Sequence, residues 1–187
     1  MAIKPILFNT EMVRAIMDGR KSCTRRICKD ANECTVPDMD YYDPDKRTYA
    51  VHNYADGKHT DKLSIAERTC PICPGDILYV RETIWQKVRY YLDVNRETQG
   101  VFCHEYRYVA TDKEPETGWN FSWVKRPSIH MPKEAARIWL RVTDVRVERL
   151  QEISAESALT EGADKYVHLN GKFDENAILT SFIGIWD

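Results

Sequence analysis

The sequence lacks three features that would assign it to a familiar class of protein. No apolar run is long enough to cross a membrane as a helix, so we expect no membrane partner. The residues after Met1 show no secretory signal pattern, which predicts a cytoplasmic protein. Positive charge is not in excess either, because the net charge is -2. Any binding of nucleic acid must therefore come from a local basic cluster and not from bulk charge.

A complete metal-binding motif is also missing, although the chain has six cysteines. Cys70 and Cys73 have the spacing of half a zinc ribbon, and Cys28 with Cys34 is spaced too widely for the usual second half. Reduced thiols are the default in a chain without a secretory signal. We therefore predict packed or surface thiols, no metal and no other cofactor; a four-sulfur zinc site is the alternative.

The length of 187 residues and a hydrophobic content of 43% favour one domain with one core, over residues 1–187. An apolar run at residues 3–8 predicts a strand. Asn9 or Thr10 can then cap a helix with an apolar face. Gly19 is the natural end of that helix.

A basic segment follows directly after Gly19. It contains Lys21, Arg25 and Arg26 together with the hydroxyl of Thr24. Arginine forks and a lysine ammonium are the groups that bind phosphate or a developing oxyanion. The segment is therefore a candidate anion or nucleotide site, and a solvated basic strand at the rim of a sheet is the alternative.

Further elements follow from alternation, turn residues and helix caps. The patterns predict strands over 48–54, 62–66, 77–80, 101–109 and 137–147, and helices over 155–161 and from 174 onward. Ser154 is the expected cap of the first of these helices, and Gly162 its end. Glu161 is the last residue before that glycine, where an acid opposes the helix dipole. A local conflict of this kind points to function.

Three other places hold candidate residues. Arg81 and Glu82 follow a strand, and we expect a simple ion pair there rather than a direct role. Trp119, Phe121 and Trp123 share one side if their segment is extended, and form either a hydrophobic flap or a stacking wall for a base. His130 is a candidate general base, but the sequence offers no carboxylate partner, so we expect a structural role.

Four stretches of the sequence match those of a known family and occur in the same order. They are residues 5–16 with Gly19-Arg20-Lys21 and Thr24-Arg25-Arg26, then residues 74–83, 127–132 and 145–153. Together they resemble the ASCH domain superfamily, particularly its phage and prophage members. The resemblance implies an α+β fold, a PUA-like mixed β-barrel with peripheral helices and loop insertions. The chief insertion would be an excursion at about residues 88–125.

The resemblance also implies an activity. Some bacterial ASCH proteins are amidohydrolases that act on N4-acetylcytidine with a lysine, a threonine and a glutamate. Lys21, Thr24 and Glu161 match these three residues. The expected substrate-binding residues are Arg20, Arg25, Arg26, Arg81, Trp119 and Trp123. Lys21 and Thr24 are three residues apart and would face opposite ways on an ideal strand, so the hypothesis requires a bulge or loop after Gly19.

Three alternatives stay open. The first is a non-catalytic module that binds RNA or a modified nucleotide through Lys21, Arg25, Arg26 and the rings near Trp119. The second is a ribonuclease, and the third a viral interaction protein with a vestigial site. Related phage proteins continue beyond a Trp-Asp pair like that at residues 186–187 into a closing strand. We therefore expect an open or otherwise covered edge, and a monomer or weak homodimer in the cytoplasm of a bacterial or phage-infected cell.

Overall fold

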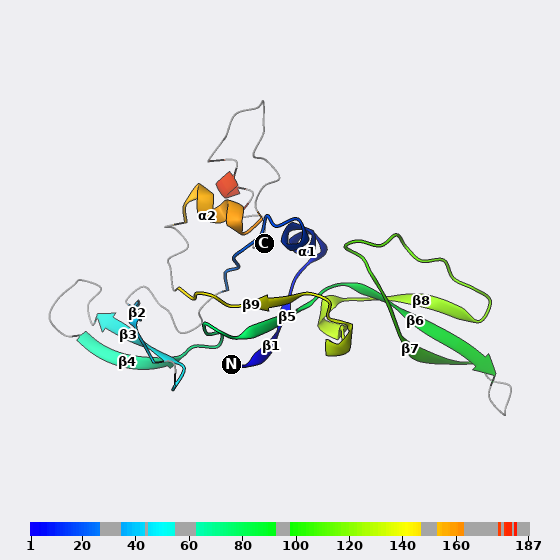
Figure 1. The fold of residues 1–187 in the computed structure, drawn as a ribbon, viewed down its shortest axis with the longest axis horizontal. Helices are drawn as coiled ribbons and strands as arrows, with labels where there is room; N and C mark the ends of the chain where they lie inside the picture. The colour runs from blue at the N-terminus through cyan, green and yellow to red at the C-terminus, as the bar shows by residue number, and fades with distance from the viewer. Residues whose placement is uncertain are drawn as a thin grey trace.

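The computed structural model describes residues 1–26, 35–43, 45–54, 63–92, 98–146, 153–162, 176, 178–180 and 182. These residues form an α+β fold, as predicted. Their strands make three separate sheets of three strands each (Figure 1). Within this part of the chain no sheet closes on itself into a barrel. No helix in the same residues is long and apolar enough to cross a membrane.

The central sheet has the order β1-β5-β9, from β1 (Ile3–Leu7), β5 (Ile77–Arg81) and β9 (Trp139–Arg141). β1 is parallel to β5, and β9 is antiparallel to β5. Between β1 and β5 the chain forms α1 (Thr10–Met17), and the side chain of Asn9 accepts a hydrogen bond from the Met12 amide at 2.8 Å. This cap and the helix are as predicted. Apolar side chains of α1 and the sheet share one core: Ile6, Phe8, Val13, Leu78 and Val80.

A second sheet lies at one end of the central sheet and contains β2 (Thr35–Asp43), β3 (Thr48–Tyr54) and β4 (Leu63–Thr69). The strands are antiparallel neighbours in chain order, so the strands predicted over 48–54 and 62–66 pair with each other. Arg47 joins this sheet to the centre through two hydrogen bonds to the buried carboxylate of Asp76, at 2.9 and 2.5 Å.

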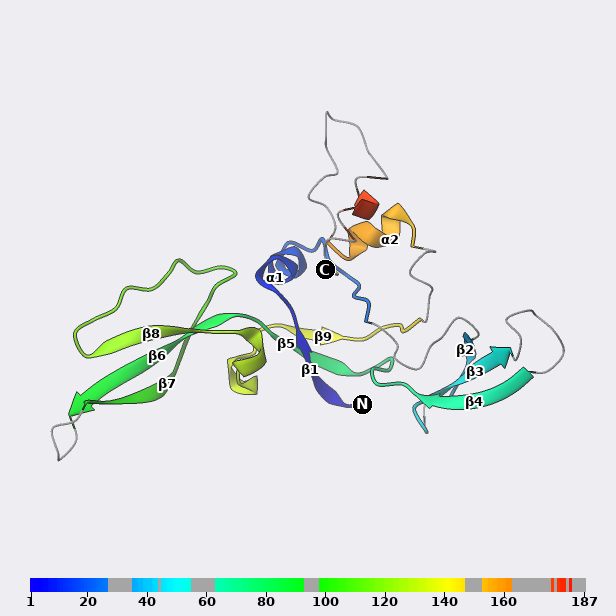
Figure 2. The same cartoon turned by 180° about the vertical axis from the view of Figure 1, so that it is seen from behind.

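The third sheet projects from the other end, as Figures 1 and 2 show, and we call it the arm. It consists of β6 (Ile84–Leu92), β7 (Thr98–Tyr108) and β8 (Phe121–Arg126), in the order β7-β6-β8. Two short 3-10 helices, η1 (Ser128–His130) and η2 (Lys133–Ala135), follow it. Ile84 packs against Met131 and Ala135 at the base of the arm. The arm largely coincides with the segment in which an excursion was expected.

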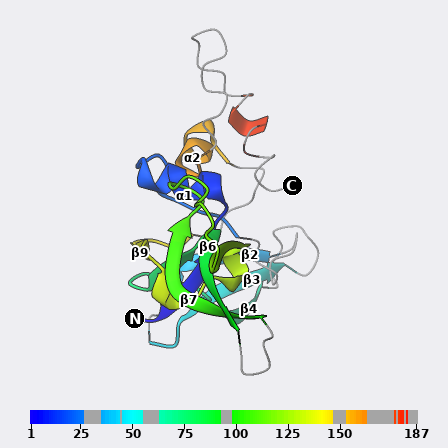
Figure 3. The ribbon, with the colours of Figure 1, turned by 90° about the vertical axis from the view of Figure 1, so that its right-hand side faces the viewer.

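α2 (Ala155–Thr160) packs beside α1, above the sheets in the view of Figure 3. Ser154 caps α2 by accepting a hydrogen bond from the Ser157 amide at 3.1 Å, and Gly162 follows its end at a φ of 92°. Both features were predicted. Ala158 packs against Ile178 and Phe182, which come from the expected C-terminal helix.

Two predicted elements differ in extent. Among the described residues of the stretch 137–147, where a strand was expected, only Trp139–Arg141 form a regular strand, paired with β5, and Arg137 turns toward Glu82. The predicted inward side of Ile138, Leu140 and Val142 is nevertheless confirmed, since all three pack against the central core. The segment around Trp119, for which no strand was predicted, becomes strand β8 from Phe121 onward, where pairing with β6 begins.

Candidate functional site

The basic segment is a loop that docks onto the end of α2. Gly19 has a φ of 73°, and residues 20–26 form no regular strand or helix. The loop conformation that the hypothesis required is therefore present. The amides of Ser22 and Cys23 both donate to the carbonyl oxygen of Thr160, at 2.9 and 3.2 Å. These bonds satisfy an end-of-helix carbonyl and bring the two segments together.

A buried ion pair forms where the segments meet. Lys21 Nζ lies 2.7 Å from Glu161 Oε2, and the two side chains are only 2% and 3% exposed. The same ammonium donates to the carbonyl oxygens of Glu161 and Cys23, each at 2.8 Å. Three acceptors use all three N–H donors of a charged lysine, whereas a neutral amine has two. Lys21 thus caps the C-terminus of α2 as a cation, which offsets the unfavourable placement of the Glu161 carboxylate.

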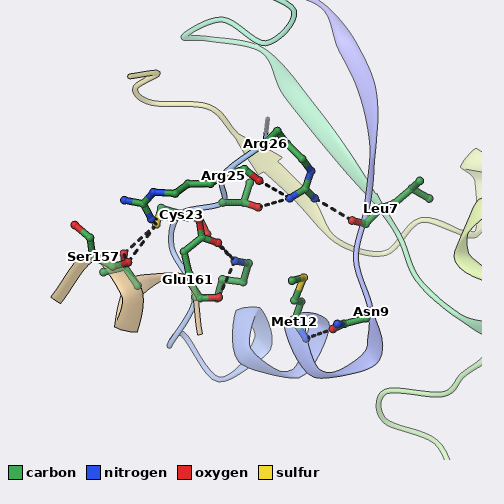
Figure 4. Close-up of polar contacts among 11 residues, drawn as sticks. Leu7, Asn9, Met12, Cys23, Arg25, Arg26, Ser157 and Glu161 are labelled. Carbon is green, nitrogen blue, oxygen red and sulfur yellow. Dashed lines mark hydrogen bonds and ion pairs between the residues drawn. The ribbon is translucent and has the colours of Figure 1, made fainter. Parts of the chain in front are cut away.

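The second oxygen of the Glu161 carboxylate is held less tightly. Its Oε1 lies 3.3 Å from Arg25 NH1, at the long end of the hydrogen-bond range. The Arg25 side chain is 21% exposed, and its guanidinium lies 5.8 Å from the centre of the Phe182 ring. The carboxylate therefore has one oxygen fixed by Lys21 and one directed toward a half-buried arginine at the solvent side (Figure 4).

Thr24 and Arg26 form a neighbouring pair at the solvent side of this site. Thr24 Oγ1 accepts a hydrogen bond from Arg26 NH1 at 2.9 Å, and Arg26 NH2 donates to the Leu7 carbonyl at 3.2 Å (Figure 4). Partial desolvation lowers the pKa of Arg26, and the negative charge of Glu161 opposes that shift. Among the described residues, Thr24 makes no hydrogen bond to Lys21 or Glu161. Its hydroxyl lies in the same loop without being part of the ion pair.

One residue of this site was not singled out from the sequence as a site residue. Cys23 Sγ lies 2.9 Å from Thr160 Oγ1 and 3.9 Å from Arg25 NH1. The sequence predicts packed or surface thiols, with zinc as the alternative only for Cys28, Cys34, Cys70 and Cys73. In the sequence Cys23 is marked only by its place two residues after Lys21, and its contact with Thr160 comes from the docking of the loop on α2.

The remaining predicted arginines lie elsewhere. Arg20 is at the surface and pairs with Asp18 at 2.9 Å. The expected Arg81–Glu82 ion pair is wrong, because neighbouring residues at the end of a strand point to opposite sides. Glu82 instead accepts two hydrogen bonds from Arg137, at 2.8 and 2.9 Å. Arg81 donates to the Ile129 carbonyl, and its buried Nε has no hydrogen-bond partner.

The two predicted tryptophans belong to the arm, which Figures 1 and 2 show apart from α2. Trp123 is in β8, and Trp119 is 95% exposed in the turn before it. They are therefore not brought to the Lys21–Glu161 ion pair. His130 is exposed in η1, and its ring makes no hydrogen bond to any described residue.

The Cys70–Cys73 pair is buried in the turn between β4 and β5. Cys70 Sγ donates to the Ile72 carbonyl at 2.7 Å, and Cys73 Sγ donates to the Cys70 carbonyl at 3.2 Å. Burial raises the pKa of the Cys70 thiol to about 11, which favours the protonated form. The described residues contain no cluster of three or more potential metal ligands. Cys28 and Cys34, the other expected zinc candidates, lie outside them.

Comparison with known proteins gives no match to a family model, a curated protein or a solved structure. The ASCH resemblance therefore rests on the four sequence stretches alone.

Proposed function

We propose that the Lys21–Glu161 site hydrolyses the acyl amide of an N4-acetylcytidine-like nucleoside. The observation that carries this proposal is the buried ion pair itself, formed between residues 140 positions apart. The second carboxylate oxygen of Glu161 is directed toward Arg25, whose side chain is 21% exposed, and Thr24 precedes Arg25 in the same loop. A fixed carboxylate, a hydroxyl donor and nearby positive charge are what hydrolysis of an amide requires.

Lys21 acts here as a positioning residue. Its three donors are already used, so it does not take a proton from Thr24. Instead it fixes the orientation of the Glu161 carboxylate. Its positive charge also stabilises negative charge that develops close by, an effect that is stronger in a site that excludes water.

Glu161 acts as the general base. Its Oε1 accepts a proton from a water molecule as the water oxygen bonds to the acyl carbon. The electron pair of the C=O double bond moves to the carbonyl oxygen, and the Thr24 hydroxyl donates a hydrogen bond to this oxyanion. When the C–N bond breaks, Glu161 returns the proton to the leaving amino group. The products are cytidine and acetate.

The hydrogen bond from Arg26 to Thr24 supports the role of the hydroxyl. A hydroxyl that accepts a hydrogen bond from a cation is polarised, so it donates its own hydrogen bond more strongly. Arg26 is therefore expected to affect the rate through Thr24, without contact to the reacting atoms.

The proposal includes three properties taken from the resemblance. The central sheet would be the core of a PUA-like barrel, the site would lie near its mouth, and the protein would act in the cytoplasm of a bacterial or phage-infected cell. RNA that contains the acylated base is a natural extension of the nucleoside substrate.

A chromatographic time course of N4-acetylcytidine with purified protein tests the proposal. We expect wild type to form cytidine. Glu161→Gln keeps the size of the side chain but removes the base, and we expect the rate to fall by at least about 100-fold. Thr24→Val removes the hydroxyl with little change in volume, and we expect about a 100-fold loss.

Ser22→Ala is the matched control, since Ser22 is an exposed hydroxyl of the same loop, and we expect its rate to equal that of wild type. Thermal melts establish that each variant is folded. Two results would overturn the proposal: no conversion by folded wild type at an enzyme concentration close to that of the substrate, or full activity in Glu161→Gln.

A further inference from the structure

The arm carries an excess of positive charge in a chain whose net charge is -2. Its three strands contain one acidic residue, Glu105, and five basic residues: Lys87, Arg89, Arg107, Lys125 and Arg126. The charge of the chain is therefore distributed unevenly. A local cluster of this kind attracts anions even when the whole protein is slightly acidic.

Strand register places four of these five cations on one face. Residues paired directly in an antiparallel sheet share a face. Trp85 is paired with both Arg107 and Lys125. Two positions further along β6, Lys87 is paired with Trp123, and Arg89 is then paired with Phe121. We call the following residues the cationic face: Trp85, Lys87, Arg89, Tyr91, Arg107, Phe121, Trp123 and Lys125.

Cations and aromatic rings are in contact across this face. Lys87 Nζ lies 4.8 Å from the centre of the Phe121 ring and 5.8 Å from that of Trp123. Phe121 and Trp123 therefore share one side, as predicted, whereas the third predicted ring, Trp119, is in the turn before β8 and is 95% exposed. Tyr91 is 51% exposed near the tip of the arm. The face thus combines two half-buried rings, Phe121 and Trp123, with the exposed ring of Tyr91, all among basic side chains.

The positive charges exceed the acidic groups that could neutralise them. Glu105 is shared between Lys87, at 2.7 Å, and Arg89, at 3.0 Å. Arg107 and Lys125 are exposed, and neither forms a salt bridge with a residue in the described ranges. Within those ranges, at least two charges on this face therefore have no protein counter-ion at ion-pair distance. An anionic ligand would supply one.

The opposite face of the arm is used for attachment. It contains Ile84, which packs against Met131 and Ala135, and Tyr108, whose hydroxyl donates to the Ala135 carbonyl at 2.9 Å. The base of the arm is held to the rest of the molecule by that face. On the cationic face Trp85 is buried at the base, whereas Arg89, Tyr91, Arg107 and Lys125 are exposed and can meet a ligand.

We propose that the cationic face binds single-stranded nucleic acid. Arg89, Arg107 and Lys125 would contact the phosphates, and unpaired bases would stack on Tyr91 and beside the rings of β8. A duplex hides its base faces, and an acidic peptide has no bases to stack. This surface is separate from the Lys21–Glu161 site, so the proposal does not depend on hydrolysis.

Fluorescence anisotropy with a labelled 12-residue oligouridylate tests the proposal. Arg107→Glu/Lys125→Glu should weaken binding by more than tenfold. The slope of log affinity against log salt should become shallower by about 1.4, because two phosphates of the single strand are no longer neutralised by the protein. The matched control is Lys46→Glu/Arg141→Glu, which makes the same change in net charge at exposed residues outside the arm. Its binding should stay close to that of wild type.

Tyr91→Ala keeps the charge and tests stacking separately, and we expect affinity to fall by about tenfold. Equal weakening in the arm and control variants would overturn the proposal, because it would show a bulk-charge effect or binding by the basic loop at Lys21. Binding of an RNA duplex or of polyglutamate as tightly as the single strand would also overturn it. The anisotropy titration does not depend on turnover of N4-acetylcytidine, so failure of the hydrolase proposal would be seen independently.

Discussion

Two ion pairs of the same chemistry lie in opposite surroundings. Lys21–Glu161 and Lys87–Glu105 both join an ammonium to a carboxylate at 2.7 Å. The first pair is almost completely buried, whereas the Glu105 side chain is 44% exposed. A buried charge cannot lose its partner without a large penalty, and an exposed one can exchange its partner for solvent or a ligand. The burial of an ion pair, and not the distance between its charged atoms, thus decides whether the pair is fixed or can exchange a partner for solvent or a ligand.

The largest expected effect is on the stability of the buried pair. Lys21→Ala leaves the Glu161 carboxylate without its main partner and should lower the free energy of unfolding by about 3–5 kcal/mol. For a chain of this size the melting temperature should fall by roughly 10 °C. Chemical denaturation and thermal melts measure both quantities.

The double variant Lys21→Met/Glu161→Leu is the control for this prediction. It removes both charges and keeps apolar volume, so most of the lost stability should return. A single variant as stable as wild type would contradict the view that the pair is buried and interdependent.

The second expected effect is a pH dependence of the free energy of unfolding, which arises from Asp76, another buried carboxylate. Hydrogen bonds from Arg47 hold the pKa of Asp76 well below its usual range. A lowered folded-state pKa stabilises the protein at pH values above about 4, the pKa in the unfolded chain. This contribution is lost as the pH falls further, through the folded-state pKa. Unfolding free energies between pH 6 and about 2.5 should therefore fall more steeply for wild type than for Asp76→Asn.

Glu105 is the exposed counterpart of Asp76. Its pKa is also lowered, chiefly by the hydrogen bond from Lys87. Glu105→Gln should nevertheless leave the melting temperature within about 2 °C of wild type, because solvent screens an exposed pair. A fall in melting temperature as large as that in Lys21→Ala would contradict the difference between the buried and the exposed pair.

The smallest expected effect is a gain in affinity for oligouridylate. Glu105→Gln releases Lys87 and Arg89 from their shared acid, so affinity for oligouridylate should rise by about two- to threefold. Glu161→Gln makes the same chemical change at the buried pair and should leave that affinity unchanged. Anisotropy titrations of the two variants side by side give the answer, and a gain in both or in neither would contradict the assignment of the surface.

Local signals in the sequence predicted much of the fold. Asn9 and Ser154 cap the two α-helices as expected, and Gly19 and Gly162 follow their ends with positive φ. These features depend on neighbouring residues only. The strand over 137–147 was overestimated because regular pairing with β5 involves only three residues, which a single segment does not reveal.

The candidate site could be predicted only in part. Lys21 and Glu161 were paired through the family resemblance, since nothing local joins residues so far apart. The contact between Cys23 and Thr160 depends on how the loop docks on α2, and the sequence carries no direct signal for it. Arg81 was paired with its neighbour Glu82 by proximity in the chain, although strand geometry separates adjacent side chains.

The most direct test of the account is the initial rate of cytidine formation from N4-acetylcytidine in three proteins: wild type, Glu161→Gln and Arg107→Glu/Lys125→Glu. We expect the first and third proteins to turn over free nucleoside at the same rate and Glu161→Gln to be at least about 100-fold slower. Equal rates in wild type and Glu161→Gln, or no turnover by folded wild type, would contradict the assignment of the buried pair as a hydrolytic site.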